Sequence, residues 1–201
     1  MTRQKRSEAR STQVLDAAAE CFVQDGFHNA SMSKLAERAN MSVGHIYHYF
    51  ENKDAVIKAL VEREIRDADE RTSEIVTYDG ERFFESSREK LQEAIARKAD
   101  PFHSVLNMEI IAESQRNPEI AKILRDFDEL MITRFTAFFR DRLKLDNPEA
   151  RVEMLFLIFQ GLPIRLIRNP DINEEDIMPM IERTIRFVLD MPPESPDGQN
   201  S

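Results

Sequence analysis

Two histidines, a tyrosine and a glycine share one face of a short predicted helix in the N-terminal quarter of the chain. At about 100° per residue, Gly44, His45, His48 and Tyr49 lie opposite the apolar residues of that helix. Imidazole and phenol groups both donate and accept hydrogen bonds. This face is therefore expected to read base edges and phosphates, and histidine contacts would make that binding sensitive to pH.

Two amphipathic helices within residues 31–53 must position this face. Apolar residues at helical spacing mark the first helix: Met32, Leu35, Ala36 and Ala39. A second apolar set marks the other helix: Val43, Ile46, Tyr47 and Phe50. Residues 40–42 turn between them, because Asn40 tolerates the left-handed conformation and Ser42 caps the second helix. This spacing is that of a helix-turn-helix.

Helices are also predicted on both sides of this pair. The first helix should run from about Arg10 to Gln24 and end at Gly26, and Ser31 should cap the helix that follows. Asn52 should cap a long helix that continues to about residue 76. Lys53 lies in the first turn of that helix, where it is expected to meet a backbone phosphate.

The net charge of −9 argues against a nucleic-acid partner, but the charge is unevenly distributed. Residues 1–55 contain seven basic and seven acidic side chains, so the remainder carries the whole deficit. Arg3, Lys5, Arg6 and Arg10 leave an excess of +3 over Glu8 before the predicted first helix. Such an arm can meet phosphates or enter a minor groove. The alternative is a disordered tail that only solvates the terminus.

The order of these features resembles the TetR family of transcriptional regulators. The resemblance is carried by residues spread over the first quarter of the chain: Val14 to Ala18, Phe22, Gly26-Phe27, Ser31, Leu35-Ala36, Ala39, Ser42 to Gly44, Ile46-Tyr47, Tyr49-Phe50 and Lys53. Asn40 stands where the family more often has glycine, and Gly44-His45 stands where Gly-Thr is commoner, which alters what can be read.

The resemblance implies an all-α fold with three parts. Residues 1–53 would form a three-helix DNA-binding domain with a basic N-terminal arm, residues 54–191 a larger helical effector-binding and dimerisation domain, and residues 192–201 a disordered tail. The implied DNA contacts come from the arm, the helix-turn-helix and the start of the fourth helix: Arg3, Lys5, Arg6, Ser31, Ser33, Ser42, Val43, Gly44, His45, Tyr47, His48, Tyr49 and Lys53.

The C-terminal part is also predicted to be helical, because it shows no convincing alternation of apolar and polar residues that would indicate a strand. Prolines at helix starts divide it into segments at 81–99, 101–116, 118–145, 148–168 and 174–190. Apolar stripes on the last two would, by resemblance, form a four-helix dimer interface: Val152, Leu155, Phe156, Phe159, Ile177, Ile181, Ile185 and Val188. The alternative is that both stripes serve only the core of one chain.

By the same resemblance, the middle helices should enclose a pocket for a small apolar or aromatic effector. The candidates are bulky or deformable side chains with a few polar partners: Phe84, Phe102, His103, Met108, Ile111, Phe127, Met131, Arg134 and Phe135. Glu109 and Gln115 are further candidate polar contacts. Any single Phe or Met at helical spacing is more often a core residue.

Other classes of function find little support in the sequence. His45 and His48 lack further ligands for a metal site, and no phosphate loop or catalytic motif is present, so neither a metal, nor a cofactor, nor catalysis is expected. Cys21 reads as a buried thiol and not as a redox sensor. The longest apolar run, Met154 to Phe159, is far shorter than the roughly 20 residues of a membrane span, so a cytoplasmic protein is expected.

The sequence thus predicts a homodimeric repressor that binds a palindromic operator in double-stranded DNA and is released by a small-molecule effector. Two alternatives stay open. An activator of the same fold would differ only in where its operator lies relative to a promoter. A helical ligand-binding adaptor would use the helix-turn-helix for protein contacts, and the basic arm and Lys53 argue against it.

Overall fold

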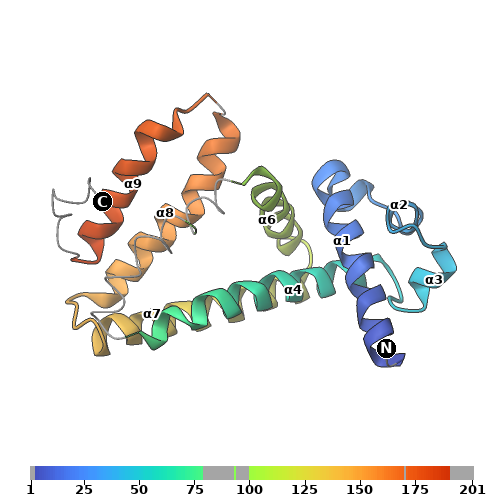
Figure 1. The fold of residues 1–201 in the computed structure, drawn as a ribbon, viewed down its shortest axis with the longest axis horizontal. Coiled ribbons are helices and arrows are strands. Elements are labelled where there is room, and N and C mark those ends of the chain that lie inside the picture. Colours follow the sequence, from blue (N-terminus) through green and yellow to red (C-terminus); the bar gives the residue numbers. More distant parts are fainter. Residues whose placement is uncertain (1–2, 79–92, 94–99, 170, 191–201) are drawn as a thin grey trace, which may run out of the picture. The chain divides into compact units, whose positions relative to one another are not determined.

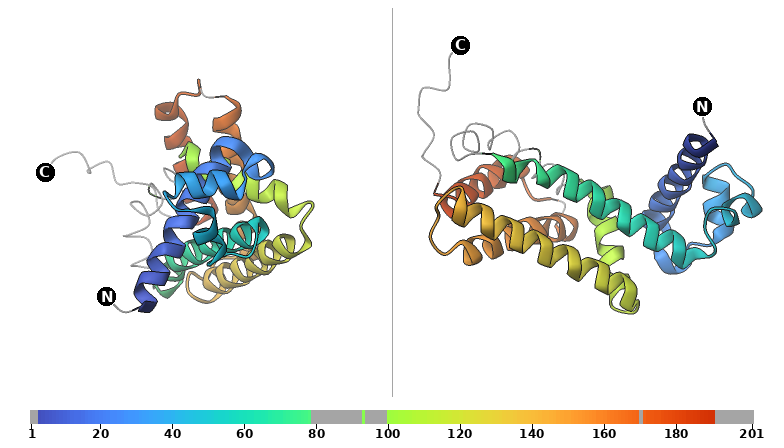
Figure 2. Two further views of the ribbon diagram at one scale, coloured as in Figure 1. Left: turned by 90° about the vertical axis from the view of Figure 1, so that its right-hand side faces the viewer. Right: turned by 90° about the horizontal axis from the view of Figure 1, so that it is seen from below.

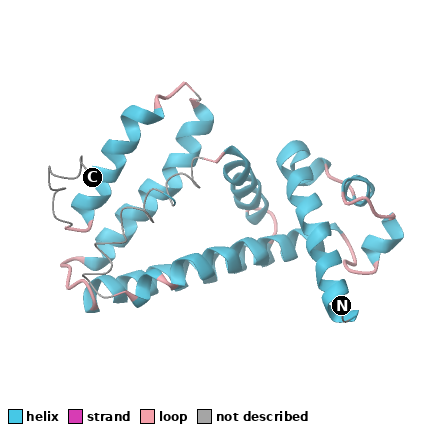
Figure 3. Ribbon diagram, in the orientation of Figure 1, coloured by secondary structure: helices cyan, strands magenta, loops and turns pink. Residues whose placement is uncertain are grey.

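The computed structural model describes residues 3–78, 93, 100–169 and 171–190. These residues form helices joined by short turns, and no strand occurs among them, which confirms the all-α prediction (Figure 3). None of the helices so described is long and apolar enough to cross a membrane. The predicted helix at 81–99, the candidate pocket residue Phe84 and the tail at 192–201 lie outside the described residues.

The helices begin close to where caps and prolines predict them (Figure 1). The elements in chain order are α1 (Arg3–Asn29), α2 (Met32–Arg38), α3 (Val43–Tyr47), α4 (Lys53–Ser73), a 3-10 turn η1 (Ile75–Thr77), α6 (Pro101–Ser114), α7 (Pro118–Asp141), α8 (Pro148–Arg168) and α9 (Glu174–Val188). Proline opens α6, α7 and α8, since its fixed φ suits the first helical turn and its missing N–H is not needed there.

The described residues pack into two compact units. The first lies within Met1–Arg71 and Val105–Phe127, and the second within Thr72–Ser104 and Asp128–Ser201. The first unit therefore includes most of α6 and the start of α7, which the sequence assigned to the effector-binding part. The functional boundary at residue 53 stays a prediction.

The first unit is built around α1. Val14, Ala18 and Phe22 are fully buried, and the ring of Phe22 meets that of Phe27 edge to face with centroids 4.4 Å apart. Both views of Figure 2 show α2 and α3 beside α1. The first turns of α4 add four buried side chains: Val56, Ile57, Leu60 and Val61. Cys21 is buried as predicted, and burial raises the pKa of its thiol.

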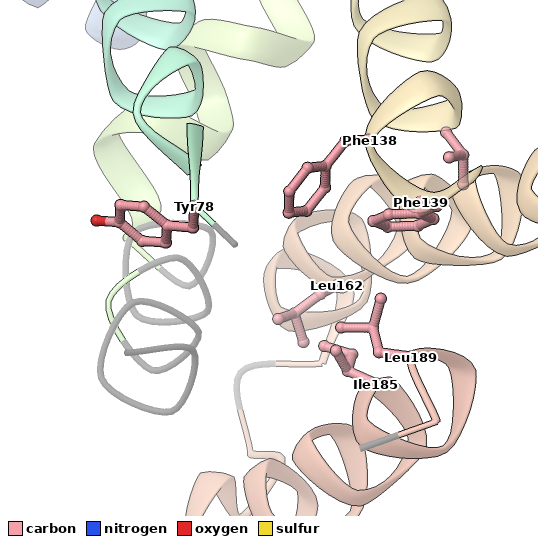
Figure 4. Packing of buried hydrophobic residues seen from close by; sticks show 7 residues of the cluster. Tyr78, Phe138, Phe139, Leu162, Ile185 and Leu189 are labelled. Carbon is pink, nitrogen blue, oxygen red and sulfur yellow. The ribbon is translucent and has the colours of Figure 1, made fainter. Parts of the chain in front are cut away.

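The second unit has its own core where α7, α8 and α9 meet. Figure 4 shows Phe138 and Phe139 on α7 above Leu162, Ile185 and Leu189, all of which are buried. The guanidinium of Arg151, near the start of α8, donates to the carbonyl of Val188, to Asp190 at 2.8 Å and to Asp146. These bonds hold the end of α9 against the start of α8.

The start of α1 differs from the prediction. The sequence placed Arg3, Lys5 and Arg6 on an arm before the first helix, but α1 already begins at Arg3. Lys5, Arg6 and Arg10 are exposed along its first turns, and Arg10 donates to Gln13 at 2.8 Å. Charged residues with long side chains are good helix formers, so nothing in this segment stops the helix before Arg10. The basic residues are therefore presented on a helix rather than on an extended arm.

The end of α1 is broken at Gly26, as predicted. Its backbone has φ 75° and ψ 160°, a conformation that is essentially restricted to glycine. We expect Gly26→Ala to lower the free energy of unfolding of the first unit by about 1–3 kcal/mol. Chemical denaturation of this variant and of Gly44→Ala would test this, because Gly44 lies in open space at negative φ. Equal changes in both variants would contradict it.

Candidate nucleic-acid interface

The two helices of the predicted helix-turn-helix close on each other through their apolar faces. Leu35, Ala36 and Ala39 on the first helix are at most 3% exposed, and Ile46 on the second is fully buried. Asn40 adopts φ 51° in the turn between them, as predicted, and the amide of Met41 donates to the carbonyl of Ala36 at 2.9 Å. The motif is therefore formed as the sequence predicts.

Side-chain caps fix where α2, α3 and α4 begin. The hydroxyl of Ser31 accepts from the amide of Lys34 at 3.2 Å, and that of Ser42 accepts from the amide of His45 at the same distance. Asn52 caps α4 by accepting from the amide of Ala55 at 2.8 Å. The three predicted caps are confirmed. Ser31, Ser33 and Ser42 are exposed beside the free amides of the two helix starts, which is the chemistry that a phosphate oxygen meets.

The outward face of α3 carries the predicted rings. His45 and His48 are exposed and Tyr49 is half-buried between them, with ring centroids 5.4 Å from His45 and 5.3 Å from His48. The Tyr49 hydroxyl lies 3.4 Å from Nε2 of His45. A Cβ at Gly44 would meet nothing within 4 Å. We call His45, His48 and Tyr49 the ring cluster; it offers two imidazoles and a phenol beside a point where a partner can approach the backbone closely.

Tyr47 corrects one part of the sequence prediction. It was placed on the buried face with Ile46 and Phe50, but its side chain is 51% exposed. Ile46 and Phe50 are four residues apart and align on the core, whereas Tyr47 is rotated by about 100° from Ile46 and α3 ends at that residue. Val43 is half-buried. Tyr47 thus adds a phenol to the outer surface, in line with its predicted phosphate contact.

Lys53 has a role that the sequence did not predict. Its ammonium group donates to three backbone carbonyls at the end of α1: Phe27 at 2.8 Å, Ala30 at 3.1 Å and His28 at 3.3 Å. An ammonium has three N–H groups, so all of its donors are directed into the protein. A contact between Lys53 and a phosphate would require one of these bonds to break. The cation satisfies carbonyls that a helix end leaves without partners.

Ion pairs engage the other basic residues of the helix-turn-helix as well. Lys34 pairs with Asp25 at 2.8 Å, and Arg38 pairs with Glu20 at 3.1 Å. Both partners lie on α1, so these pairs hold α2 against it. In the described part of residues 1–55, the exposed positive charge most available to phosphates is therefore that of Lys5, Arg6 and Arg10.

The predicted effector-pocket residues are divided between the two units. Met108, Ile111 and Phe127 belong to the first unit, and Ile111 is 47% exposed. In the second unit, Met131 is buried and accepts from the hydroxyl of Thr72 at 3.6 Å, and Phe135 lies 6.2 Å from Phe139 between ring centroids. Arg134 is half-buried on the same helix.

Phe102 and His103 lie at the start of α6. Their ring centroids are 5.6 Å apart, and Phe102 is half-buried while His103 is exposed. The His103 ring pairs with the carboxylate of Asp100, and this hydrogen bond lowers the pKa of that carboxyl. Gln115, another candidate, is exposed and bonds Ser114.

A small open cleft of about 180 Å³ occurs in the first unit, and none of the predicted pocket residues lines it. Charged and apolar side chains from the end of α1, the start of α4 and the region where α6 ends line it: Phe27, His28, Lys53, Asp54, Ile57, Glu113 and Arg116. Its small size and mixed charges differ from the apolar cavity that the sequence predicts.

Three of the predicted dimer-interface residues are core residues instead. Val152, Ile185 and Val188 are 0%, 1% and 8% exposed, so they cannot contribute surface to a partner. The other five are half-buried, and four of them pack against the core of the second unit: Leu155, Phe156, Phe159 and Ile181. Ile177 is the fifth. The buried part of the predicted stripe thus belongs to the core of the second unit. The sequence could not show this, because an apolar stripe alone does not say what it packs against.

A different apolar face of α8 and α9 is exposed. Met154, Leu157 and Ile164 are 45%, 66% and 43% exposed and share one face of α8, while Met180 and Phe187 on α9 are 56% and 80% exposed. We call these five residues the exposed apolar face. A signal for it was present: six successive apolar residues, 154–159, cannot all face one core, so that helix is apolar on more than one side.

Comparisons with known proteins agree with this geometry. The family model "Bacterial regulatory proteins, tetR family" matches residues 14–60, which span the core of α1 through the start of α4. The transcriptional regulator UidR of Escherichia coli K12 is 33% identical over 138 residues, which are 67% of this chain and 66% of UidR; the match thus spans just under two thirds of that relative.

Solved structures show the same fold. GusR of Salmonella enterica has a TM-score of 0.66 at 23% identity, with 90% of this chain and 96% of GusR covered. FadR of Bacillus subtilis, solved in complex with stearoyl-CoA, has a TM-score of 0.67 at 19% identity, with 89% and 97% covered. A formed helix-turn-helix, the family match over it and the full-length fold agree. The chain belongs to the TetR family of bacterial regulatory proteins.

Proposed function

We propose that this chain is a homodimeric, sequence-specific transcriptional repressor that a small apolar or aromatic effector releases from its operator. The observation that carries the proposal is the ring cluster on the outward face of α3, within a helix-turn-helix whose apolar faces and caps are complete. Such a helix enters the major groove and reads base edges, while neighbouring groups bind phosphates.

The proposed DNA contacts follow from exposure and chemistry. His45, His48 and Tyr49 would face base edges, and Gly44 would let the backbone approach the groove closely. The exposed hydroxyls of Ser31, Ser33, Ser42 and Tyr47 would bind phosphates. Lys5 and Arg6 would supply positive charge from the first turns of α1, and we propose that Arg3 joins them. Phosphate contacts of this kind position the protein, and base contacts select the sequence.

The exposed apolar face supports the homodimer. Its five side chains are apolar groups left in water by a single chain. Gly161 lies between Leu157 and Ile164 on the same face of α8, and a Cβ there would meet nothing within 4 Å, which leaves room for a partner helix. A two-fold dimer would present two helix-turn-helix motifs to two half-sites, so the operator would be palindromic.

The effector is proposed to bind the helical remainder of the chain. Met131 and Phe135 on α7 and Phe102 on α6 are apolar and buried or half-buried, which suits an apolar or aromatic ligand. The related fold of FadR binds stearoyl-CoA, so long-chain acyl groups are one class to try. A ligand that prefers the dimer unable to bind DNA can weaken binding only by its difference in affinity for the two states, commonly about 1–3 kcal/mol.

Selection of genomic DNA fragments by the purified protein at physiological salt, followed by footprinting, tests the proposal. We expect a palindromic footprint that overlaps a promoter and weakens when an acyl-CoA or aromatic ligand is added. A site upstream of the promoter that raises transcription would instead show an activator. Binding without any preferred site would contradict sequence-specific regulation and favour an adaptor.

His48→Ala should weaken binding to the selected site by about 1–3 kcal/mol, because a lost base contact costs roughly that much. Binding to random DNA should change little, since most of that affinity comes from phosphates. Titration of labelled DNA at fixed salt measures both. His28→Ala is the control, because its exposed ring lies at the end of α1 and not on α3. Equal affinity of the two variants for the selected site would show that His48 does not contact a base.

A further inference from the structure

Phe27 contacts residues of three helices in the first unit. Its side chain, its carbonyl and its amide each meet a different helix. Its side chain is 1% exposed and packs on Phe22 of α1. Its carbonyl accepts from Lys53 of α4 at 2.8 Å. Its amide donates to Oε2 of Glu109 on α6 at 2.9 Å. The peptide that follows the break at Gly26 is thus fixed from both sides.

Glu109 reaches this peptide because of the conformation at Gly26. With φ 75°, Gly26 turns the next amide away from the axis of α1, where a continuing helix would have used it. A Cβ at Gly26 would lie 3.4 Å from Oε2 of Glu109, so the carboxylate lies directly over the Gly26–Phe27 peptide. The sequence suggested Glu109 as a polar contact for an effector; here its carboxylate is used within the protein.

Glu109 and Lys53 hold the turn in complementary ways. The carboxylate accepts from the Phe27 amide, and the ammonium donates to the Phe27 carbonyl and to two carbonyls that follow it. Lys53 belongs to the segment that carries the helix-turn-helix, whereas Glu109 is 82 residues away in sequence from Phe27. The Glu109 bond therefore ties this turn to α6.

We propose that the Glu109–Phe27 hydrogen bond is the contact through which α6 fixes the turn at Gly26–Phe27, near the end of α1, so that Glu109 is a positioning residue for operator binding. This inference rests on the proposed function and adds the residue that couples it to α6. Losing the bond frees the Phe27 amide and loosens the turn, although the bonds from Lys53 remain. A looser turn must be ordered again when both helix-turn-helix motifs engage their half-sites.

Three substitutions separate the hydrogen bond from the charge. Glu109→Ala removes both. Glu109→Gln keeps the length and an oxygen acceptor but removes the charge. Glu109→Asp keeps the charge but is one methylene too short to reach the amide. Glu113→Ala is the matched control, because Glu113 lies one turn further along α6 and pairs with Arg116 at 2.8 Å.

Hydrogen exchange of the Phe27 amide, resolved by 15N-phenylalanine labelling of the full chain, reports the bond directly. We expect exchange about tenfold faster in Glu109→Ala and Glu109→Asp, and near wild-type exchange in Glu109→Gln and Glu113→Ala. The amide of Phe22 should keep its wild-type rate in all four variants, which separates release of the turn from unfolding of α1. Affinity for the selected DNA site should fall on the order of tenfold in the same two variants.

Unchanged Phe27 exchange in Glu109→Ala, or wild-type behaviour of Glu109→Asp with loss in Glu109→Gln, would overturn the proposal. So would fast Phe27 exchange with unchanged affinity for a site that the wild-type protein selects. If the wild-type protein selects no site, the proposed function fails and the role of Glu109 in DNA binding fails with it. The exchange data still show whether the bond exists, so the two failures are distinguishable.

Discussion

Replacing both Phe187 and Leu157 by aspartate should convert the protein into a monomer with no measurable preference for its operator. These are the most exposed side chains of the exposed apolar face, at 80% and 66%. Burying one such side chain is worth about 1.5–3 kcal/mol, and a two-fold interface buries each of them twice. The dimer should therefore weaken by at least about 3–6 kcal/mol for each substitution, or roughly 10²–10⁴-fold.

Sedimentation equilibrium measures the association, and the footprinting assay measures its effect on DNA. Leu130→Asp is the matched control, because Leu130 is 46% exposed on α7 and lies outside the exposed apolar face. It should stay dimeric and bind DNA as the wild type does. A dimer in the double variant would mean that the protein associates through another surface. A monomer that still binds its operator with full affinity would show that dimerisation is not needed.

Lys53→Met should destabilise the first unit by about 2–3 kcal/mol and lower its unfolding midpoint by roughly 10 °C. Methionine keeps much of the length and apolar volume of lysine but cannot donate. Three carbonyls at the end of α1 would lose a charged donor, and the turn that leads into α2 would lose its tie to α4. Thermal denaturation followed by circular dichroism measures the shift.

Lys58→Met provides the comparison on the same helix. The side chain of Lys58 is 40% exposed and pairs with Glu119, and that hydrogen bond raises the pKa of the Lys58 ammonium. An exposed pair of this kind is screened by water and salt, so its loss should change the unfolding midpoint far less than Lys53→Met does. Similar midpoints for the two variants would show that the internal bonds of Lys53 contribute no more than a surface ion pair.

Local signals in the sequence were sufficient for the helix-turn-helix. Ser31, Ser42 and Asn52 cap their helices because a short polar side chain meets the free amides of the next turn, and Asn40 takes the left-handed turn. The ring cluster followed from helical periodicity alone. Each of these features depends on residues fewer than about five positions apart, so no knowledge of the rest of the chain was needed.

Hydrophobic periodicity could not predict the contacts between segments that are distant in sequence. Whether an apolar stripe on α8 faces the chain's own core or a partner depends on where α7 and α9 lie, so Val152 and Ile185 were assigned to an interface although they are buried. The extent of α1 was also missed, since charged residues are compatible with either a helix or an arm.

Local sequence patterns were thus enough to identify the family, the order of the described helices and the outward face of α3 that we propose to meet DNA. How side chains with several possible partners are used depended on tertiary packing. Lys53 has three donors that could serve a phosphate or three carbonyls, and Glu109 could serve an effector or the amide of Phe27. Hydrogen bonds of both kinds have similar local chemistry, so the choice depends on which groups the packing of α1, α4 and α6 brings within about 3 Å.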